Sequence, residues 1–248
     1  MPLADVVEEA KRIVIAAEEQ KLVLRVIGGL AVNLHCPSTK LHRLSRKYPD
    51  IDFFSYAKLS MRLQHFFQEI DYEPAKMFNA LQGNRMLLFI DAGQERRIDV
   101  FLDVFQMCHR IDLRKRLELD KWTLTPADLL VTKLQVIEIN EKDYVDAIAL
   151  LLDHDIVDRD EPDTINGRYL SRLCSNDWGI YKTLTRNLGW VSDSVEKYVD
   201  NKEAVELVRS RIRSLLDMIE RQPKSVRWTL RAAVGEKVPW YELPDARH

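Results

Sequence analysis

The chain has 248 residues, of which 46% are hydrophobic and 31% are charged, and its formal net charge at pH 7 is −2. This composition is typical of a globular protein with one large or two small domains, and the small net charge argues against a general nucleic-acid coat. No run approaches the ~20 apolar residues of a membrane span, and the acidic, amphipathic N-terminus lacks a signal-peptide pattern, so we expect a cytoplasmic protein.

The first predicted elements are a helix, a strand and a tight turn. Residues 3–20 place apolar side chains at three- and four-residue spacings, which predicts a helix, and residues 22–27 predict a strand. Gly28 and Gly29 follow, at the opening of a second helix. A strand-to-helix turn without Cβ atoms lets a phosphate approach free backbone N–H groups. A purely geometric role in the turn explains the glycines as well.

An acid pair follows the basic interval 36–47. Asp50 and Asp52 are two residues apart in a predicted strand, which places both carboxylates on one face. A hard divalent cation stabilises such a pair most readily, although a solvated strand end is the alternative interpretation. The basic interval is either solvated surface or close to a bound triphosphate, and Arg46 is a preferred residue for the second role.

The next segments predict a helix and then several strands. A helix is expected over residues 58–70, and strands are expected over 77–80, 85–90 and 97–104. Asp99 lies in the last strand between apolar residues, where a third carboxylate could complete a two-metal site. These elements predict a mixed sheet with flanking helices, an α/β class.

The second half predicts helices and carries three notable polar residues. Lys133 lies in a helix that begins at Thr125, and it is either a snorkelling side chain or a phosphate-binding cation. Asp143 follows Asn140 in a capping pattern, and Asp146 is either an auxiliary ligand or part of the polar face.

The C-terminal third predicts a long helix over residues 202–221 and is locally basic, with Trp228 among the cations. The basic residues are either a solvated face or a surface that binds an RNA or an acidic partner. The three cysteines are widely separated, as expected of buried thiols in a reducing compartment.

Three features together resemble the nucleotidyltransferase superfamily, which includes DNA polymerase β and the antibiotic nucleotidyltransferases: the Gly-Gly turn, the Asp-Ile-Asp strand and the lone Asp between apolar residues. A later Lys-Leu pair, followed by a basic-Asp-x-x-Asp segment at 142–146, is similar to a motif of the AbiEii-type toxin branch and its uncharacterised relatives. The resemblance covers about residues 22–152.

This resemblance implies a nucleotidyltransferase core over residues 1–122, an all-helical domain over 123–248 and a nucleotide-binding cleft between them. It implies transfer of a nucleoside monophosphate from a nucleoside triphosphate to a hydroxyl of RNA (tRNA included), a protein or a small molecule, with a toxin-like role and an antitoxin partner as further expectations. The implied ligands of Mg²⁺ or Mn²⁺ are Asp50, Asp52 and Asp99, the last of which also helps to deprotonate the acceptor. The implied nucleotide-binding residues are Gly28, Gly29, Lys133 and Arg46, and the auxiliary residues are Asp143 and Asp146.

Two departures from the family pattern leave an alternative open. Tyr48 and Pro49 precede Asp50 where the family usually has Thr-Lys, and Val136 and Asn140 stand where a small residue and an Arg are usual. The alternative is a catalytically silent module on the same fold that binds a nucleotide or a protein. A helical interaction protein whose acids merely lie on the surface would require three coincidences and ranks last.

Overall fold

The computed structural model describes residues 2–41, 43–91, 93 and 95–243. The chain forms two compact units. The predicted single border near Trp122 places residues 35–45 and 106–110 in the first domain, whereas in the structure both segments belong to the second unit. Unit 1 comprises Met1–Leu34, Arg46–Phe105 and Ile111–Leu124, and unit 2 comprises His35–Ser45, Gln106–Arg110 and Thr125–His248.

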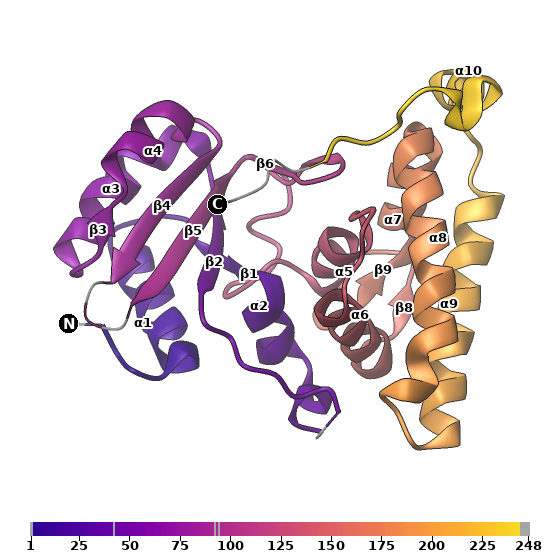
Figure 1. Cartoon of the computed structure of the whole chain (residues 1–248), viewed down its shortest axis with the longest axis horizontal. Helices are drawn as coiled ribbons and strands as arrows, with labels where there is room; N and C mark the ends of the chain where they lie inside the picture. The colour runs from indigo at the N-terminus through magenta and orange to yellow at the C-terminus, as the bar shows by residue number, and fades with distance from the viewer. Residues whose placement is uncertain (1, 42, 92, 94, 244–248) are drawn as a thin grey trace. The chain divides into compact units, whose positions relative to one another are not determined.

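A mixed five-stranded sheet forms the centre of unit 1, with the strand order β1-β2-β5-β4-β3 (Figure 1). β2 is parallel to β5, and the other neighbouring pairs are antiparallel. A parallel pair requires a long crossover connection, and the segment from α3 to β4 supplies it. The strands are β1 (Arg25–Ile27), β2 (Ile51–Ser55), β3 (Glu73–Pro74), β4 (Met86–Asp91) and β5 (Arg96–Leu102).

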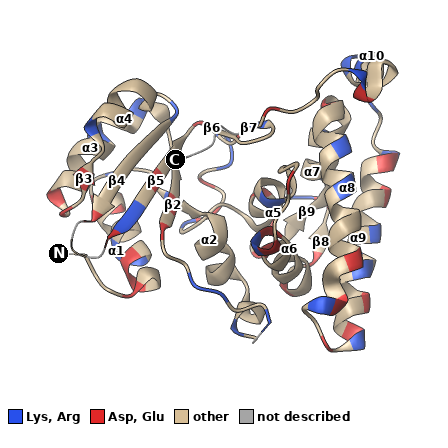
Figure 2. Ribbon diagram, in the orientation of Figure 1, with Lys and Arg blue, Asp and Glu red and all other residues tan. Residues whose placement is uncertain are grey.

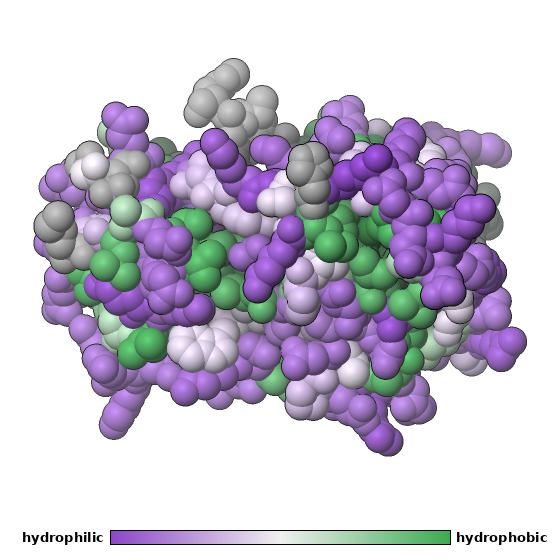
Figure 3. Space-filling model, turned by 90° about the horizontal axis from the view of Figure 1, so that it is seen from below, coloured by the Kyte–Doolittle hydropathy of each residue, from purple (hydrophilic) through white to green (hydrophobic). Residues whose placement is uncertain are grey.

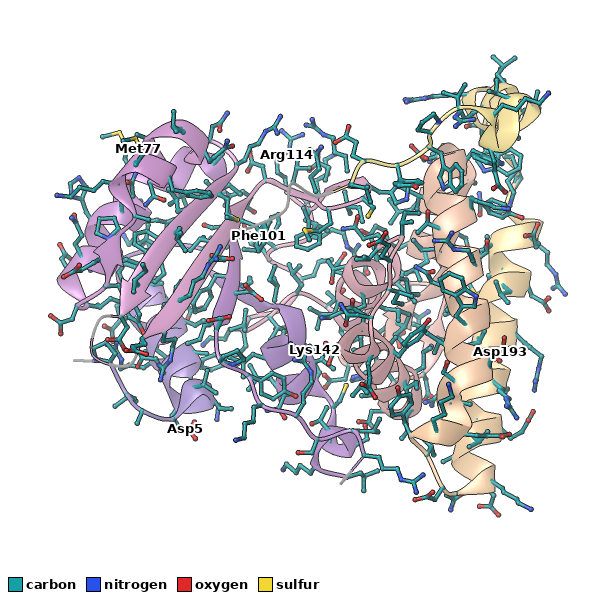
Figure 4. All side chains as sticks on the ribbon, viewed as in Figure 1. Asp5, Met77, Phe101, Arg114, Lys142 and Asp193 are labelled. Carbon is teal, nitrogen blue, oxygen red and sulfur yellow. The ribbon has the colours of Figure 1, made fainter. Side chains whose placement is uncertain are left out.

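The helices described in unit 1 confirm three predictions, one of them α2 as the second helix expected at the glycines, and contradict one. α1 and α3 confirm the helices expected over 3–20 and 58–70, but the strand expected over 77–80 is wrong, because α4 forms there. Its Met, Ala, Leu and Gln residues favour a helix, and the Asn79 side chain exchanges hydrogen bonds of 3.1 and 2.8 Å with the backbone of Leu88. Met77 of α4 is 78% exposed and points outward (Figure 4). The bounds are α1 (Val6–Glu19), α2 (Gly28–His35), η2 (Ala57–Leu59), α3 (Ser60–Glu69) and α4 (Lys76–Gln82).

An aromatic cluster joins α3 to the sheet. The ring of Phe67 stacks on that of Phe89 with their centroids 4.3 Å apart, and Phe67 also contacts Phe53, Phe66 and Tyr72. All five side chains are buried. Because such aromatic pairs add ~0.5–1.5 kcal/mol each beyond their area burial, the cluster fixes the strand that carries Asp52.

Unit 2 is mainly helical, and a two-residue parallel pair, β8 with β9, is its small sheet. Together the two units confirm the predicted class, a mixed sheet flanked by helices and followed by a helical part. After β7, turns and bends lead the chain toward α5. The bounds are η1 (Pro37–Lys40), β6 (Val104–Gln106), β7 (Arg110–Asp112), α5 (Pro126–Leu134), α6 (Glu141–Asp153), β8 (Ile156–Val157), β9 (Ile165–Asn166), α7 (Gly167–Asn176), α8 (Trp178–Ser194), η3 (Val195–Lys197), α9 (Lys202–Arg221), α10 (Val226–Val234) and η4 (Gly235–Lys237).

The predicted helix starts in unit 2 are confirmed. The Thr125 side chain accepts a hydrogen bond from the Asp128 backbone N–H, and the Asn140 side chain accepts one from the Asp143 N–H. The long helix predicted at 202–221 is α9, whose apolar stripe is buried. Figure 2 shows basic and acidic residues interspersed along α8 and α9. This pattern agrees with the ion pair of 2.8 Å between Arg209 and Glu196.

The surface seen in Figure 3 is mostly hydrophilic, with hydrophobic residues in separate patches. All three cysteines are free and buried, as predicted. Within the described part of the chain, no helix is both long and apolar enough to cross a membrane.

Candidate functional site

Asp52 and Asp99 lie directly opposite each other on the parallel strands β2 and β5. Asp52 also lies opposite Ile27, the last residue of β1, so that the glycine turn begins beside it. Asp99 is 5% exposed, and Asp52 is partly exposed. Because neighbouring strands are only ~4.8 Å apart, the register brings two of the predicted carboxylates together.

Asp50 lies outside this ladder. It occupies an exposed bend immediately before β2, whereas the sequence predicts it inside the strand with Asp52. Pro49, which has no N–H to donate, prevents the ladder from extending past Asp50 on this side. Across the described residues, no three His, Cys, Asp or Glu side chains are grouped so as to hold a metal by themselves.

The glycine turn lies against Asp52. Gly28 has a φ of +69°, and a Cβ at this position would lie 2.6 Å from Asp52 Oδ2. A Cβ on Gly29 would overlap the guanidinium of Arg46. Any larger residue at either position would therefore displace an acid or a cation from the N-terminus of α2. A phosphate that approaches this turn would meet free backbone N–H groups.

Arg46 is the predicted basic residue that the structure places at this turn. Its guanidinium lies over the Tyr48 ring, 4.6 Å from the centroid, in addition to its position beside Gly29. The residues that come together in unit 1 are Gly28, Gly29, Arg46, Asp52 and Asp99.

Sequence reasoning missed Arg97. Its Nε donates a hydrogen bond of 2.7 Å to Asp99 Oδ1, and the two side chains form an ion pair. The available signal was the Arg-x-Asp spacing, since residues i and i+2 of a strand share a face. Arg97 therefore places a positive charge beside Asp99, one of the two opposed acids.

The predicted residues Lys133, Asp143 and Asp146 form a buried ion cluster in unit 2. Lys133 Nζ lies 2.7 Å from Asp146 Oδ2 and 3.3 Å from Asp143 Oδ1. The Asp146 side chain is 1% exposed, and that of Lys133 is 12% exposed. Because an uncompensated charge here would be costly, the three residues stabilise one another inside unit 2. A role of Lys133 toward a nucleotide stays a prediction.

No protein-family model and no curated protein matches the chain. Among solved structures, it is similar to the solution structure of the antibiotic-resistance factor ANT(2'')-Ia, an aminoglycoside nucleotidyltransferase. The two chains share 14% identity, the match covers 86% of this chain and 94% of that chain, and the TM-score is 0.33.

Proposed function

We propose that this chain is a metal-dependent nucleotidyltransferase, which transfers a nucleoside monophosphate from a nucleoside triphosphate to a hydroxyl group. The observation that carries the proposal is the strand register: Asp52 lies opposite Asp99, with Gly28 directly against its carboxylate. Two acids beside a turn that lacks Cβ atoms are the chemistry that a metal-bound triphosphate requires.

The residues present fit a divalent ion. Mg²⁺ in phosphoryl-transfer sites is held by one or two carboxylates together with phosphate oxygens, and Asp52 and Asp99 supply two carboxylates. Asp50, just before β2, is proposed as the third ligand. When bound, the ion would offset the negative charge of the triphosphate and of the leaving pyrophosphate.

The protein groups have distinct roles in this reaction. Gly28 and Gly29 accommodate the β- and γ-phosphates against the backbone, and Arg46 contributes positive charge beside them. The acceptor oxygen forms a bond to the α-phosphorus while the bond from that phosphorus to the α,β-bridging oxygen breaks, and pyrophosphate leaves with the electron pair. The Asp99 carboxylate takes up the hydroxyl proton. Lys133, if it acts on the nucleotide, must exchange its acidic partners for a phosphate.

The acceptor hydroxyl belongs to an RNA, a protein or a small molecule in this proposal. The AbiEii-type resemblance of the segment at 142–146 extends the proposal to a toxin-like role with an antitoxin partner.

The experiment is a transfer assay with each α-labelled nucleoside triphosphate and Mg²⁺, using bulk tRNA or a protein extract as acceptor. We expect label in the acceptor from the α-phosphate and none from a γ-labelled nucleotide. Asp52→Asn should reduce the rate of transfer at least about a hundredfold. This is the loss of rate expected when one group that stabilises charge in a transition state is removed. Asp217→Asn, at an exposed acid of α9, is the matched control. Equal transfer by Asp52→Asn would overturn the assignment.

A catalytically silent nucleotide-binding module is the second candidate function. The favouring observations are that Arg97 already pairs with Asp99 and that Arg46 already lies over Gly29. Both cations balance charge where a metal and a phosphate would otherwise be needed. Such a module would bind a nucleotide equally well without Mg²⁺ and would transfer no label.

A further inference from the structure

A pocket lies wholly within unit 2. Its volume is about 590 Å³, which is in the range of small-molecule sites. Its lining comes from residues 106–110, the junction of α7 and α8, α10 and residues 239–242. The last of these segments is held in place by the Glu242 N–H, which donates to the Cys108 carbonyl at 3.0 Å.

The pocket is rich in indole rings. Trp178, Trp228 and Trp240 line it, together with Tyr241, although the whole chain has only five tryptophans. The rings of Trp178 and Trp240 meet edge to face with centroids 5.9 Å apart, and those of Trp240 and Tyr241 are 5.2 Å apart. Several aromatic rings in one lining offer planar apolar surface on which a planar ligand can stack.

Two hydrogen-bond donors in this lining have no acceptor. The indole Nε1 atoms of Trp228 and Trp240 are both buried, and neither has a hydrogen-bond partner among the described residues. Buried polar atoms are nearly always satisfied by protein, water or a ligand. Because both nitrogens lie beneath the surface of the pocket, their rings meet a ligand through other atoms of the indole.

The acids of the pocket are already occupied by the protein. Asp177 Oδ1 accepts hydrogen bonds from the Gly179 and Ile180 N–H groups as the cap of α8, at 2.8 and 3.0 Å. Glu242 Oε2 accepts a hydrogen bond of 2.7 Å from Gln106. Both carboxylates therefore already have hydrogen-bond partners within the protein.

The cations of the pocket differ in how far the protein already binds them. Arg231 is held over the Trp178 ring, 4.9 Å from its centroid, and donates to the carbonyls of Gly235 and Val238. Arg110 and Arg227 are exposed at the pocket. The pocket thus combines aromatic walls with positive charge at its opening.

We propose that this pocket binds a nucleobase together with its phosphate. The base would stack on the indole rings, and the phosphate would pair with Arg110 and Arg227. Stacking platforms within a positively charged groove are the two recurring elements of sites for single-stranded nucleic acid. A purely apolar ligand would leave the cations unused. The proposal does not depend on transfer in unit 1.

The same chemistry has two sources, a free mononucleotide and a nucleotide of a single strand. The test is tryptophan fluorescence of the full chain in buffer without Mg²⁺, titrated with AMP, UMP, short oligoadenylate and short oligouridylate. We expect saturable quenching by at least one probe, and the Asp52→Asn variant should bind identically, which separates this pocket from the site in unit 1. Equal affinity for monophosphates and oligonucleotides indicates a free nucleotide, and binding of oligonucleotides alone indicates a strand.

Two variants test the pocket itself. Arg227→Glu should weaken binding at least roughly fivefold and reduce its salt dependence, because a phosphate contact is lost. Trp240→Ala should weaken binding about five- to 150-fold, as expected for the loss of one stacked base. The matched controls are Arg221→Glu, an exposed cation of α9, and Trp190→Phe, and both should bind as wild type.

Two outcomes would overturn the proposal: no quenching by any probe, or wild-type affinity in Arg227→Glu. Circular dichroism and thermal unfolding show whether Trp240→Ala still folds. If it does not, Arg227→Glu decides, because Arg227 is exposed and its replacement leaves the packing intact.

Discussion

The Asp52 carboxylate lies against the Cα of Gly28, with Oδ2 only 2.6 Å from the point where a Cβ would stand. Gly28 also has a φ of +69°, in the left-handed region that L-residues rarely adopt. The glycine and the acid therefore constrain each other, although the 23 residues 29–51 separate them in the sequence.

Gly28→Ala should abolish nucleotide binding, because the new methyl group must displace the Asp52 carboxylate. The left-handed backbone should also lower the free energy of unfolding by about 1–2 kcal/mol. Isothermal titration with nucleoside triphosphate and Mg²⁺ measures the first effect, and urea unfolding measures the second. The control is Gly189→Ala in α8, where a Cβ meets nothing within 4 Å, and stability should rise by about 0.5–1 kcal/mol. Wild-type nucleotide affinity in Gly28→Ala would contradict the prediction.

Arg97→Gln should increase the affinity of unit 1 for Mg²⁺. The guanidinium on Asp99 repels a second cation, and its removal should lower the Mg²⁺ concentration needed for half of the nucleotide-dependent rise in Tm, by about fivefold for a partly exposed pair. Arg114→Gln is the control, since Arg114, labelled in Figure 4, pairs with Asp112 at the same two-residue spacing. A higher Mg²⁺ requirement in Arg97→Gln would show that Arg97 supports the site.

Lys133→Met should destabilise unit 2 by about 3–5 kcal/mol, because it leaves the buried Asp146 carboxylate without its cation. The double variant Lys133→Met with Asp146→Leu should recover most of this loss, since both charges are removed together. Urea unfolding of the two variants and of Asp146→Leu alone measures the coupling. A loss below about 1 kcal/mol in Lys133→Met would argue that the cluster is not structural and that Lys133 is available to a ligand.

Stability should fall between pH 6.5 and about 4 because of His109. Burial lowers the pKa of His109 to about 4, while its Nε2 lies 2.8 Å from Thr183 Oγ1. In this interval the unfolded chain binds a proton at residue 109 and the folded chain does not, so acid favours unfolding. Burial also lowers the pKa of His154, which adds a contribution of the same sign.

The check for His109 is the free energy of unfolding as a function of pH. The contribution should be fully present above pH 6.5 and should decline toward pH 4, with a total on the order of 3 kcal/mol. His109→Gln should show a shallower decline over the same interval. An identical pH profile in the variant would mean that His109 does not titrate as described.

Features encoded within a few residues could be predicted from the sequence. In the caps at Thr125 and Asn140, a side chain accepts a hydrogen bond from the backbone N–H three residues later. Asp52 and Asp99 each stand in an alternating apolar run, so their positions in neighbouring strands followed from the pattern. The expected place of Asp50 inside the strand was wrong, because β2 begins only at Ile51 and Asp50 lies in the bend that follows Pro49.

Features that depend on distant segments could not be predicted. The residues around Met77 suit either a short strand or a helix, and the hydrogen bonds between Asn79 and Leu88 decide for the helix. The position of Arg46 over Gly29 depends on how a long side chain folds back from a loop. The pocket in unit 2 joins Cys108 to Trp240, and no local pattern links segments so far apart.

The most direct test of the proposed nucleotide site in unit 1 is thermal unfolding with each of the four nucleoside triphosphates, with and without Mg²⁺. A ligand at a hundredfold excess over its Kd stabilises the native state by ~2.7 kcal/mol. We predict a Mg²⁺-dependent rise in Tm with at least one nucleotide in the wild type and in Asp217→Asn, and none in Asp52→Asn. No rise with any nucleotide, or the same rise in Asp52→Asn, would contradict the proposed site.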